Sequence, residues 1–446
     1  METLFIKGLQ LFLSLSLLIF VHELGHFFWA RIFGVRVDKF YLFFDTEKFA
    51  LFRWKPKGSD TEYGIGWIPF GGYCKIAGMI DESMDKEQLL QEPKPWEYRT
   101  QSTFRRFMII SGGVLNNLIT AFLIYVAMMW TWGKDVLEMR SLDEGMQYSE
   151  YAQELGFRHG DIIWAVDGDA VDYTAFPSRL LLANDITVKR GGELLTIALP
   201  DSIGQYFLRD NAEVANFARL RFPMVVSEVV EDGGAYAAGL MQGDSVIAVN
   251  GTATHYYDEV QALLEQHAGD TIRLSFVRQG ELYTLPVLLS SDAKLGVLTS
   301  LPMVLIERLT HVEYNFWQAI PAGFDRCCEV MTNYVRQFKL VFTKEGAKSL
   351  GGFATMGSIF PDTWNWYAFW SLTAFFSLAL AFMNILPIPA LDGGHLLFVL
   401  YEMIFRRKPS DKFLEYAQTA GFFLVFGLLI LVNLNDIWKF VISKFF

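Results

Sequence analysis

The chain has 446 residues, of which 52% are hydrophobic, and it contains 40 phenylalanines. A composition this apolar excludes an ordinary soluble enzyme and favours a membrane protein. The formal net charge of −11 argues against a nucleic-acid partner, because such a partner calls for a basic face. With only three cysteines in the chain, no disulfide framework is expected.

Four apolar segments are long enough to cross the hydrocarbon core of a bilayer, which takes about 20 residues. We predict membrane spans at 4–32, 107–132, 366–386 and 416–441. Basic residues gather in the loops between spans one and two and between spans three and four, and the positive-inside rule makes both loops cytoplasmic. Both termini and the long segment between spans two and three are then expected on the other side, the periplasm of a Gram-negative cell.

The first span contains ionisable residues in the stretch LLIFVHELGHFFWA, from Leu17 to Ala30. On a helix, His22 and His26 share one face and can bind a single zinc ion, with Glu23 available as general base. In a soluble helix, a histidine is more often a hydrogen-bonded surface or core residue than a ligand. Within a span, however, three buried polar groups are costly, so a zinc site explains them better.

A third zinc ligand is expected, and Asp392 in the stretch NILPIPALDGGHLLF, just after span three, is the candidate. Span one reaches its histidines late and span three reaches Asp392 at its far end, so both motifs lie at a similar cytoplasmic depth. Two histidines and one aspartate leave the fourth tetrahedral position for water, as catalytic zinc requires. His395, one helical turn further on, is a competing ligand.

A pattern occurs twice in the segment between spans two and three, as YAQELGFRHGDIIWAVDG and YAAGLMQGDSVIAVNG. Gly160 and Gly243, and likewise Gly168 and Gly251, are 83 residues apart. Each copy predicts a short helix, a Gly-Asp turn, an apolar strand and a tight Asp-Gly or Asn-Gly turn. Repetition at this spacing indicates two tandem modules.

The two copies resemble PDZ domains, α+β modules that bind extended peptide ends by adding a strand to a sheet edge. An alternative is that the modules only pack or act as a size filter. After them, aromatic residues recur at helical spacing between 316 and 342 and predict an amphipathic helix, broken or kinked near Pro321. This helix either lies on the outer leaflet or packs against the spans.

HELGH in the first span, NxLPIPxLDGG after the third and PDZ-like modules between the spans resemble the site-2 proteases of the bacterial RseP type, over nearly the whole chain. The resemblance implies an α-helical polytopic protein of the bacterial inner membrane, with four transmembrane helices. It implies that His22, His26 and Asp392 hold Zn²⁺ and that Glu23 is the catalytic base. Span two departs from the family pattern, because it reads Gly112-Gly113 where the family usually has Gly-Pro.

The same resemblance implies a membrane-reentrant β-hairpin at IPFGGYCKIAG, Ile68 to Gly78, whose edge holds the substrate as a strand. A helical substrate must be locally unwound before water can attack, and an edge strand would satisfy its freed backbone groups. The substrate-binding residues expected from the resemblance are Gly71, Gly72, Tyr73, Cys74, Asn116, Asn384, Pro387 and Pro389.

The implied activity is that of an intramembrane zinc endopeptidase which cuts single-span membrane proteins after another protease has trimmed them. Anti-sigma factors and signal-peptide remnants are the implied substrates. One alternative is a zinc transporter, but transporters usually show repeated broken helices, which this sequence lacks. Another is a non-catalytic PDZ scaffold, which predicts that Glu23 is dispensable.

These expectations divide the chain into five parts. The parts are 1–134 with spans one and two, the HExxH motif and the hairpin loop; 135–221, a degenerate first PDZ-like domain; 222–301, the second PDZ domain; 302–365, the connecting region; and 366–446, with spans three and four and the LDG motif.

Overall fold

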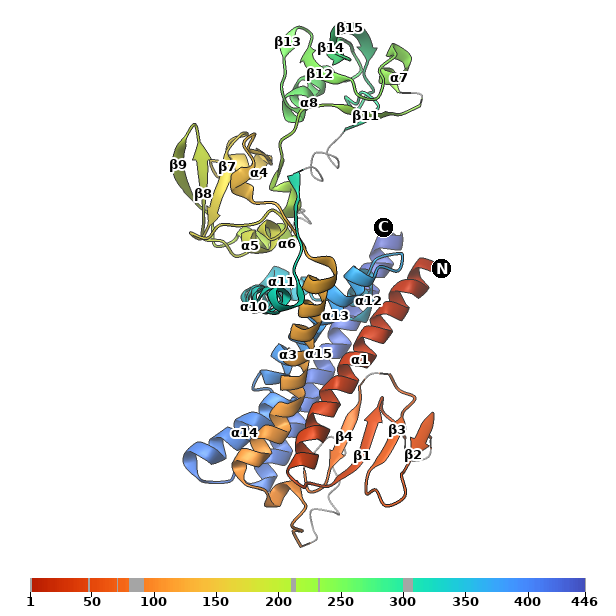
Figure 1. Ribbon diagram of the computed structural model, residues 1–446, viewed down its shortest axis with the longest axis vertical. Helices are drawn as coiled ribbons and strands as arrows, with labels where there is room; N and C mark the ends of the chain where they lie inside the picture. Colours follow the sequence, from red (N-terminus) through yellow and green to blue (C-terminus); the bar gives the residue numbers. More distant parts are fainter. Residues whose placement is uncertain are drawn as a thin grey trace. The chain divides into compact units, whose positions relative to one another are not determined.

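The computed structural model describes residues 2–46, 49–69, 71–79, 92–209, 214–231, 233–299 and 308–445. The chain forms two compact units, one of Met1–Gly133 with Glu313–Phe446 and one of Lys134–Val312. The first unit is a helical bundle with a small sheet, and the second is rich in strands (Figure 1). The finer division of the chain into five parts stays a prediction.

Four helices of the first unit are long and apolar enough to cross a membrane. They are α1 (Glu2–Ile32), α3 (Thr103–Trp132), α13 (Trp366–Ile385) and the greater part of α15 (Asp411–Phe445). A helix is the natural form for such segments, because it satisfies its own backbone groups where no water is available. These helices coincide with the four predicted spans, with ends that differ by a few residues.

The buried residues of α1 follow one another every three or four positions and therefore form one stripe along the helix. Hydrogen bonds between side chains and to the backbone join α13 to α1 and to α3. Thr373 of α13 donates a hydrogen bond to Ser14 at 3.0 Å, and Ser377 donates one to the backbone oxygen of Asn117 in α3 at 2.7 Å. The members of the stripe are Gln10, Ser14, Leu18, His22, Gly25, His26 and Ala30.

A tight turn joins α13 to α14 (Asp392–Phe405), a helix that the sequence analysis did not predict. Two glycines at the start of α14 make the turn possible. A Cβ atom on Gly393 would lie 2.0 Å from the backbone oxygen of Leu386, and one on Gly394 would lie 2.6 Å from that of Ile388. Further along, Glu402 accepts a 2.6 Å hydrogen bond from the buried Arg106, which fastens α14 to α3.

The small sheet of the first unit has the strand order β2-β3-β1-β4. Strand β1 runs parallel to β3 and antiparallel to β4. Residues 68–78 were expected to form a hairpin, but in the described part of that stretch they supply one strand, β4, whose partner β1 comes from much earlier in the chain. The strands are β1 (Val37–Leu42), β2 (Phe52–Trp54), β3 (Glu62–Ile65) and β4 (Tyr73–Ile76).

The predicted amphipathic helix is α10 (Phe316–Phe338), which begins at a capping box formed by Asn315 and Gln318. The predicted break does not occur, since the helix continues through Pro321. A proline in the second turn of a helix removes one backbone hydrogen bond and crowds the carbonyl oxygen four residues earlier, here that of Trp317, yet the remaining turns of this 23-residue helix still form. Gly323 packs closely on α3, where a Cβ would lie 2.7 Å from Val126, while Trp317 remains 77% exposed.

The second unit contains a three-stranded sheet of order β7-β8-β9 and a four-stranded sheet of order β13-β12-β14-β15, besides two-stranded pairs. Both predicted tight turns are present, with positive φ at Asp167 (48°) and Gly168 (81°) and at Asn250 (49°) and Gly251 (82°). The strands of these two sheets are β7 (Ile162–Val166), β8 (Asp185–Arg190), β9 (Glu193–Ala198), β12 (Ser245–Val249), β13 (Thr252–Ala253), β14 (Thr271–Arg278) and β15 (Glu281–Leu288).

The aspartate of the Gly-Asp dipeptide makes the same contacts in both repeats. Asp161 accepts hydrogen bonds from Arg190 at 2.7 and 2.6 Å, and Asp244 accepts two from Arg278 at 2.7 Å each. Each aspartate also accepts a backbone N–H three residues before it. The repeat in the sequence therefore corresponds to a repeated ion pair with a buried aspartate. The pair fastens the Gly-Asp turn to the end of β8 in the first copy and to the end of β14 in the second.

Shorter elements complete the structure. The two-stranded pairs are β6 (Met146–Tyr148) with β10 (Ala218–Leu220), β11 (Val226–Val229) with β16 (Val297–Thr299), and β5 (Lys134–Val136) with β17 (Thr310–Val312). The remaining helices are α4 (Glu150–Glu154), α5 (Phe176–Leu180), α6 (Ile203–Arg209), α7 (Gly234–Ala238), α8 (Tyr257–Glu265), α11 (Lys344–Ser349) and α12 (Phe353–Ser358), with 3-10 turns at Tyr98–Thr100, Met139–Ser141, Val214–Asn216 and Lys339–Phe342.

Candidate metal centre

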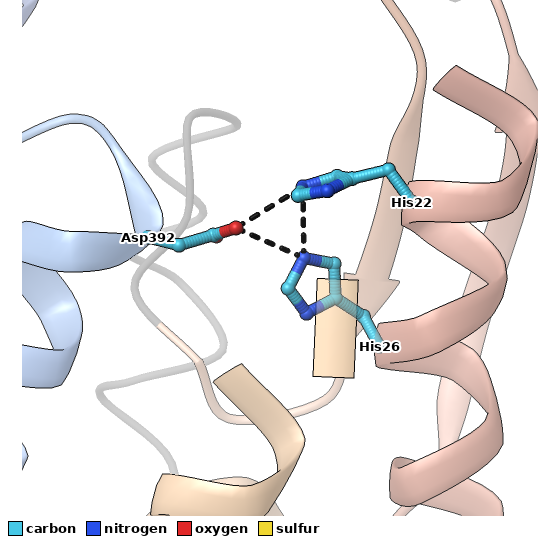
Figure 2. Close-up of side chains that lie close together, drawn as sticks. All are labelled: His22, His26 and Asp392. Atoms are coloured by element: carbon cyan, nitrogen blue, oxygen red, sulfur yellow. Dashed lines mark hydrogen bonds and ion pairs between the residues drawn. The ribbon is translucent and has the colours of Figure 1, made fainter. Parts of the chain in front are cut away.

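Three side chains from two distant parts of the sequence converge inside the helical unit (Figure 2). The Oδ2 atom of Asp392 lies 3.1 Å from Nε2 of His22 and 3.4 Å from Nε2 of His26, and the two Nε2 atoms are 3.3 Å apart. Zinc bonds of about 2.0–2.1 Å at tetrahedral angles place ligand atoms about 3.3 Å apart. The triangle of ligand atoms therefore has the size that a zinc ion needs.

The electrostatics of the cluster also suit a cation. Oδ2 of Asp392 is buried and, among the described residues, forms no hydrogen bond of good geometry, although it faces both imidazoles. A buried carboxylate oxygen without a partner is costly. Two neutral imidazoles and one carboxylate are a ligand set that zinc accepts, so the residues present fit this metal.

Close packing of α1 on α3 positions the histidines. A Cβ atom on Gly25, between the histidines, would lie 2.1 Å from the backbone oxygen of Gly112. On Gly113, a Cβ would lie 2.5 Å from both Nε2 of His26 and Cε1 of His22. Small residues allow helices in a membrane to approach this closely. The Gly112-Gly113 pair thus leaves room for the imidazoles.

Each histidine has a second contact through its other ring nitrogen. Nδ1 of His26 lies 3.0 Å from the backbone oxygen of Ile109. A carbonyl only accepts hydrogen bonds, so this nitrogen carries a hydrogen, and in the neutral imidazole that zinc binds Nε2 presents its lone pair to the cluster. Nδ1 of His22 lies 3.2 Å from the side-chain amide nitrogen of Asn117.

Glu23 is half-buried beside the histidines and close to strand β4. The backbone N–H of Cys74 donates a hydrogen bond to its carboxylate. A Cβ atom on Gly72 would lie 3.4 Å from Cγ of Glu23 and 2.8 Å from Ile19. The chain that leads into β4 therefore passes directly over the predicted catalytic base.

Of the other predicted site residues, some lie beside the histidine cluster and others contact different parts of the chain. The amide nitrogen of Asn384 lies 3.4 Å from Nε2 of His22, whereas that of Asn116 donates to the backbone oxygen of Val21 at 3.1 Å. Tyr73 directs its hydroxyl to Asp45 at 2.6 Å. Gly71 packs on the ring of Phe44, Pro387 is exposed, and Pro389 contacts Gly421 of α15.

The competing ligand His395 is not part of the cluster. Its Nε2 atom lies 2.7 Å from the amide nitrogen of Gln418 in α15. One turn of helix separates His395 from Asp392, and that turn directs the imidazole toward α15 instead of toward α1. The structure therefore favours Asp392 over His395 as the third ligand.

Comparison with known proteins agrees with this geometry. The model of peptidase family M50 matches residues 10–428, nearly the whole chain. The chain belongs to peptidase family M50. The site-2 protease family predicted from the sequence is thereby confirmed, as is the prediction of an enzyme, which favours a peptidase over a transporter or a silent scaffold.

Relatives of this M50 peptidase match it over nearly its whole length. A Vibrio cholerae protein named "Putative zinc metalloprotease" is 27% identical, over 95% of this chain and 96% of its own length. A Clostridium perfringens protein with a similar name is 25% identical over 95% and 96% of the two chains. A Haemophilus influenzae protein named "Regulator of sigma E protease" is 24% identical over 95% and 97%.

Asn117 is the site residue of this M50 peptidase that the sequence analysis missed. The family resemblance drew attention to Asn116, but the buried residues Ile110, Gly113, Asn117 and Ala121 of α3 follow one another at helical spacing. Projecting span two on a helical wheel from Gly113 would have placed Asn117 on the inner face.

Proposed function

We propose that this M50 peptidase is an intramembrane zinc endopeptidase in which His22, His26 and Asp392 hold the zinc ion and Glu23 is the general base. The observation that carries the proposal is the triangle of two Nε2 atoms and a buried carboxylate oxygen, with sides of 3.1, 3.3 and 3.4 Å. The names of the zinc metalloprotease relatives support the choice of metal.

Bound at this site, zinc would lower the pKa of a water molecule toward about 7 and polarise the scissile carbonyl. Glu23 accepts the proton from the attacking water and delivers it to the leaving amine. The hydrogen bond from Cys74 keeps the Glu23 carboxylate at the junction of α1 and β4. His22 and His26 remain fixed by α3, so the reacting groups stay in register with the substrate.

The substrate strand is proposed to align along β4. This strand is the last in the sheet order and contacts α1, which carries Glu23. A substrate helix that unwinds here can exchange its own backbone hydrogen bonds for bonds to a strand. The residues proposed to contact the substrate are Gly71, Gly72, Tyr73, Cys74, Asn116, Asn384, Pro387 and Pro389.

The sheet that contains β4 is proposed to re-enter the membrane. Its far side carries large aromatic side chains that are about half exposed, namely Phe52 (54%), Trp54 (57%) and Trp67 (48%). The basic residues Arg53 and Lys55 lie next to them in the sequence. Aromatic rings flanked by cations suit the boundary between lipid tails and headgroups.

The proposed substrates are single-span membrane proteins, such as anti-sigma factors and signal-peptide remnants, in a bacterial inner membrane. The name of the Haemophilus influenzae relative supports the first class. The repeats within Lys134–Val312 are proposed to be PDZ-like modules on the periplasmic side. They would either bind a newly exposed peptide end or exclude untrimmed substrates by size.

The test uses the purified full-length protein in detergent, with zinc content and cleavage of a single-span substrate as readouts. We expect about one zinc per chain in wild type and in Glu23→Gln, with cleavage lowered by about 10²–10⁴-fold in the variant. Glu2→Gln, at the exposed start of the same helix, is the matched control and should cleave normally. A wild type without zinc, or a Glu23→Gln variant that cleaves normally, would overturn the proposal.

A further inference from the structure

The two histidines of the cluster are held by different kinds of partner. His26 is held by a backbone oxygen, that of Ile109 at 3.0 Å, which no substitution at that position removes. His22 is held by a side chain, the amide of Asn117 at 3.2 Å. Asn117 is completely buried in the core between helices. One imidazole of the site therefore depends on a replaceable group.

The chemistry of zinc binding fixes what that group must do. Nε2 of His22 lies at a corner of the ligand triangle, 3.1 Å from Oδ2 of Asp392. A neutral imidazole that gives its Nε2 lone pair to a metal carries its hydrogen on Nδ1, and this hydrogen needs an acceptor. The amide of Asn117 can accept only through Oδ1.

We propose that Asn117 is a positioning residue that accepts a hydrogen bond from Nδ1 of His22 through Oδ1 and so keeps Nε2 turned toward zinc. The inference rests on the proposed zinc site. Oxygen and nitrogen of an amide have nearly the same shape, so half a turn about the last side-chain bond exchanges them. Oδ1 forms no hydrogen bond among the described residues, so none has to break when the amide turns.

The backbone around Asn117 is rigid enough for this role. Ser377 of α13 donates a 2.7 Å hydrogen bond to the backbone oxygen of Asn117. One turn earlier, Gly113 has its Cα against the two imidazoles, where a Cβ would lie 2.5 Å from ring atoms. Neighbours on both sides thus hold the amide opposite Nδ1 of His22.

The experiment measures zinc affinity by chelator competition on the full-length protein in detergent. Asn117→Leu removes the acceptor and should weaken zinc binding by about 10–100-fold, the usual effect of losing a partner of a metal-bound histidine. Asn117→Asp has acceptor oxygens only and should bind zinc nearly as tightly as wild type. Ser111→Ala, which alters a buried hydroxyl bonded within α3, is the matched control and should not change the affinity.

Direct observation of the imidazole does not depend on any variant. In zinc-loaded wild type with ¹⁵N-labelled histidine, NMR should show His22 with hydrogen on Nδ1 and metal on Nε2. Hydrogen on Nε2, wild-type affinity in Asn117→Leu, or equal weakening in Asn117→Asp and Asn117→Leu would each overturn the inference. A wild type that binds no zinc would instead overturn the proposed function, so the two failures are distinguishable.

Discussion

Two aspartates with buried carboxylate oxygens show how differently a carboxylate can be used in this protein. Asp244, in the second unit, accepts two hydrogen bonds of 2.7 Å from Arg278 and one of 2.8 Å from the backbone N–H of Met241. Asp392, in the helical unit, has a buried oxygen that lies 3.1 and 3.4 Å from two imidazole nitrogens and, among the described residues, forms no hydrogen bond of good geometry. One carboxylate is fully satisfied and the other is not.

The difference is the one expected between a structural carboxylate and the proposed metal ligand. Satisfied buried charges stabilise the arrangement of the chain around them, and removing one partner leaves the other unpaired. A buried carboxylate oxygen that faces two imidazole nitrogens without a hydrogen bond of good geometry is instead arranged for a cation. Substituting the two aspartates should therefore damage different properties of the protein.

The largest effect is expected from Asp392→Asn. This change preserves shape but removes the charge, so zinc affinity should fall by more than the roughly 10–100-fold typical of losing an outer partner, and cleavage should fall with it. With zinc removed by chelation, the variant should unfold at the same temperature as wild type or above it, because the new amide still faces both imidazoles and no longer carries a charge in a largely buried position. Normal zinc content and cleavage in Asp392→Asn would contradict the proposal that Asp392 binds the metal while Asp244 is structural.

A smaller effect, on stability alone, is expected from Asp244→Asn. The new amide group places donors opposite Arg278 and the N–H of Met241, at a cost of about 1–3 kcal/mol in the free energy of unfolding. Limited proteolysis of the full-length protein should show faster cutting within Lys134–Val312, with zinc content unchanged. Asp169→Asn breaks the pair between Arg179 and the 69%-exposed Asp169 and should change stability little. Equal effects from both substitutions would contradict this account.

The smallest effect is a pH dependence of the second unit. Burial raises the pKa of Asp244, but hydrogen bonds from Arg278 and Met241 outweigh burial, and the pKa lies below its ordinary value of 3.8. The stabilising contribution is therefore complete above the unfolded pKa and is lost as the pH falls below about 3.8 toward the folded pKa. Proteolysis by an acid protease should accelerate over this range in wild type, and less steeply in Asp244→Asn; parallel profiles would refute the assignment.

Much of the candidate metal centre could be predicted from the sequence because it depends on local periodicity. Two histidines four residues apart on one helix must share a face. The position of Asp392 relative to span three placed it at the same depth as the histidines. The Asp-Gly and Asn-Gly turns were also predictable, because few residues adopt positive φ readily.

The parts that the sequence did not reveal depend on contacts between distant segments. The partner of β4 is β1, more than 30 residues earlier, and no local pattern identifies such a partner. The arginine that pairs with Asp161 lies at the end of β8, 29 residues away, and the arginine that pairs with Asp244 lies at the end of β14, 34 residues away. Asn117 was not predicted because the family motif points to Asn116, and the face of α3 that is buried depends on its packing against α1 and α13.

The most direct test of the central claim is X-ray absorption at the zinc edge on the purified, full-length protein. The account predicts a first shell of nitrogen and oxygen only, at about 2.0–2.1 Å, with the scattering pattern of two imidazoles. In Asp392→Asn, the loaded fraction should fall. A sulfur shell near about 2.3 Å, a single imidazole, or an unchanged spectrum and occupancy in Asp392→Asn would contradict the assignment of His22, His26 and Asp392 as the ligands.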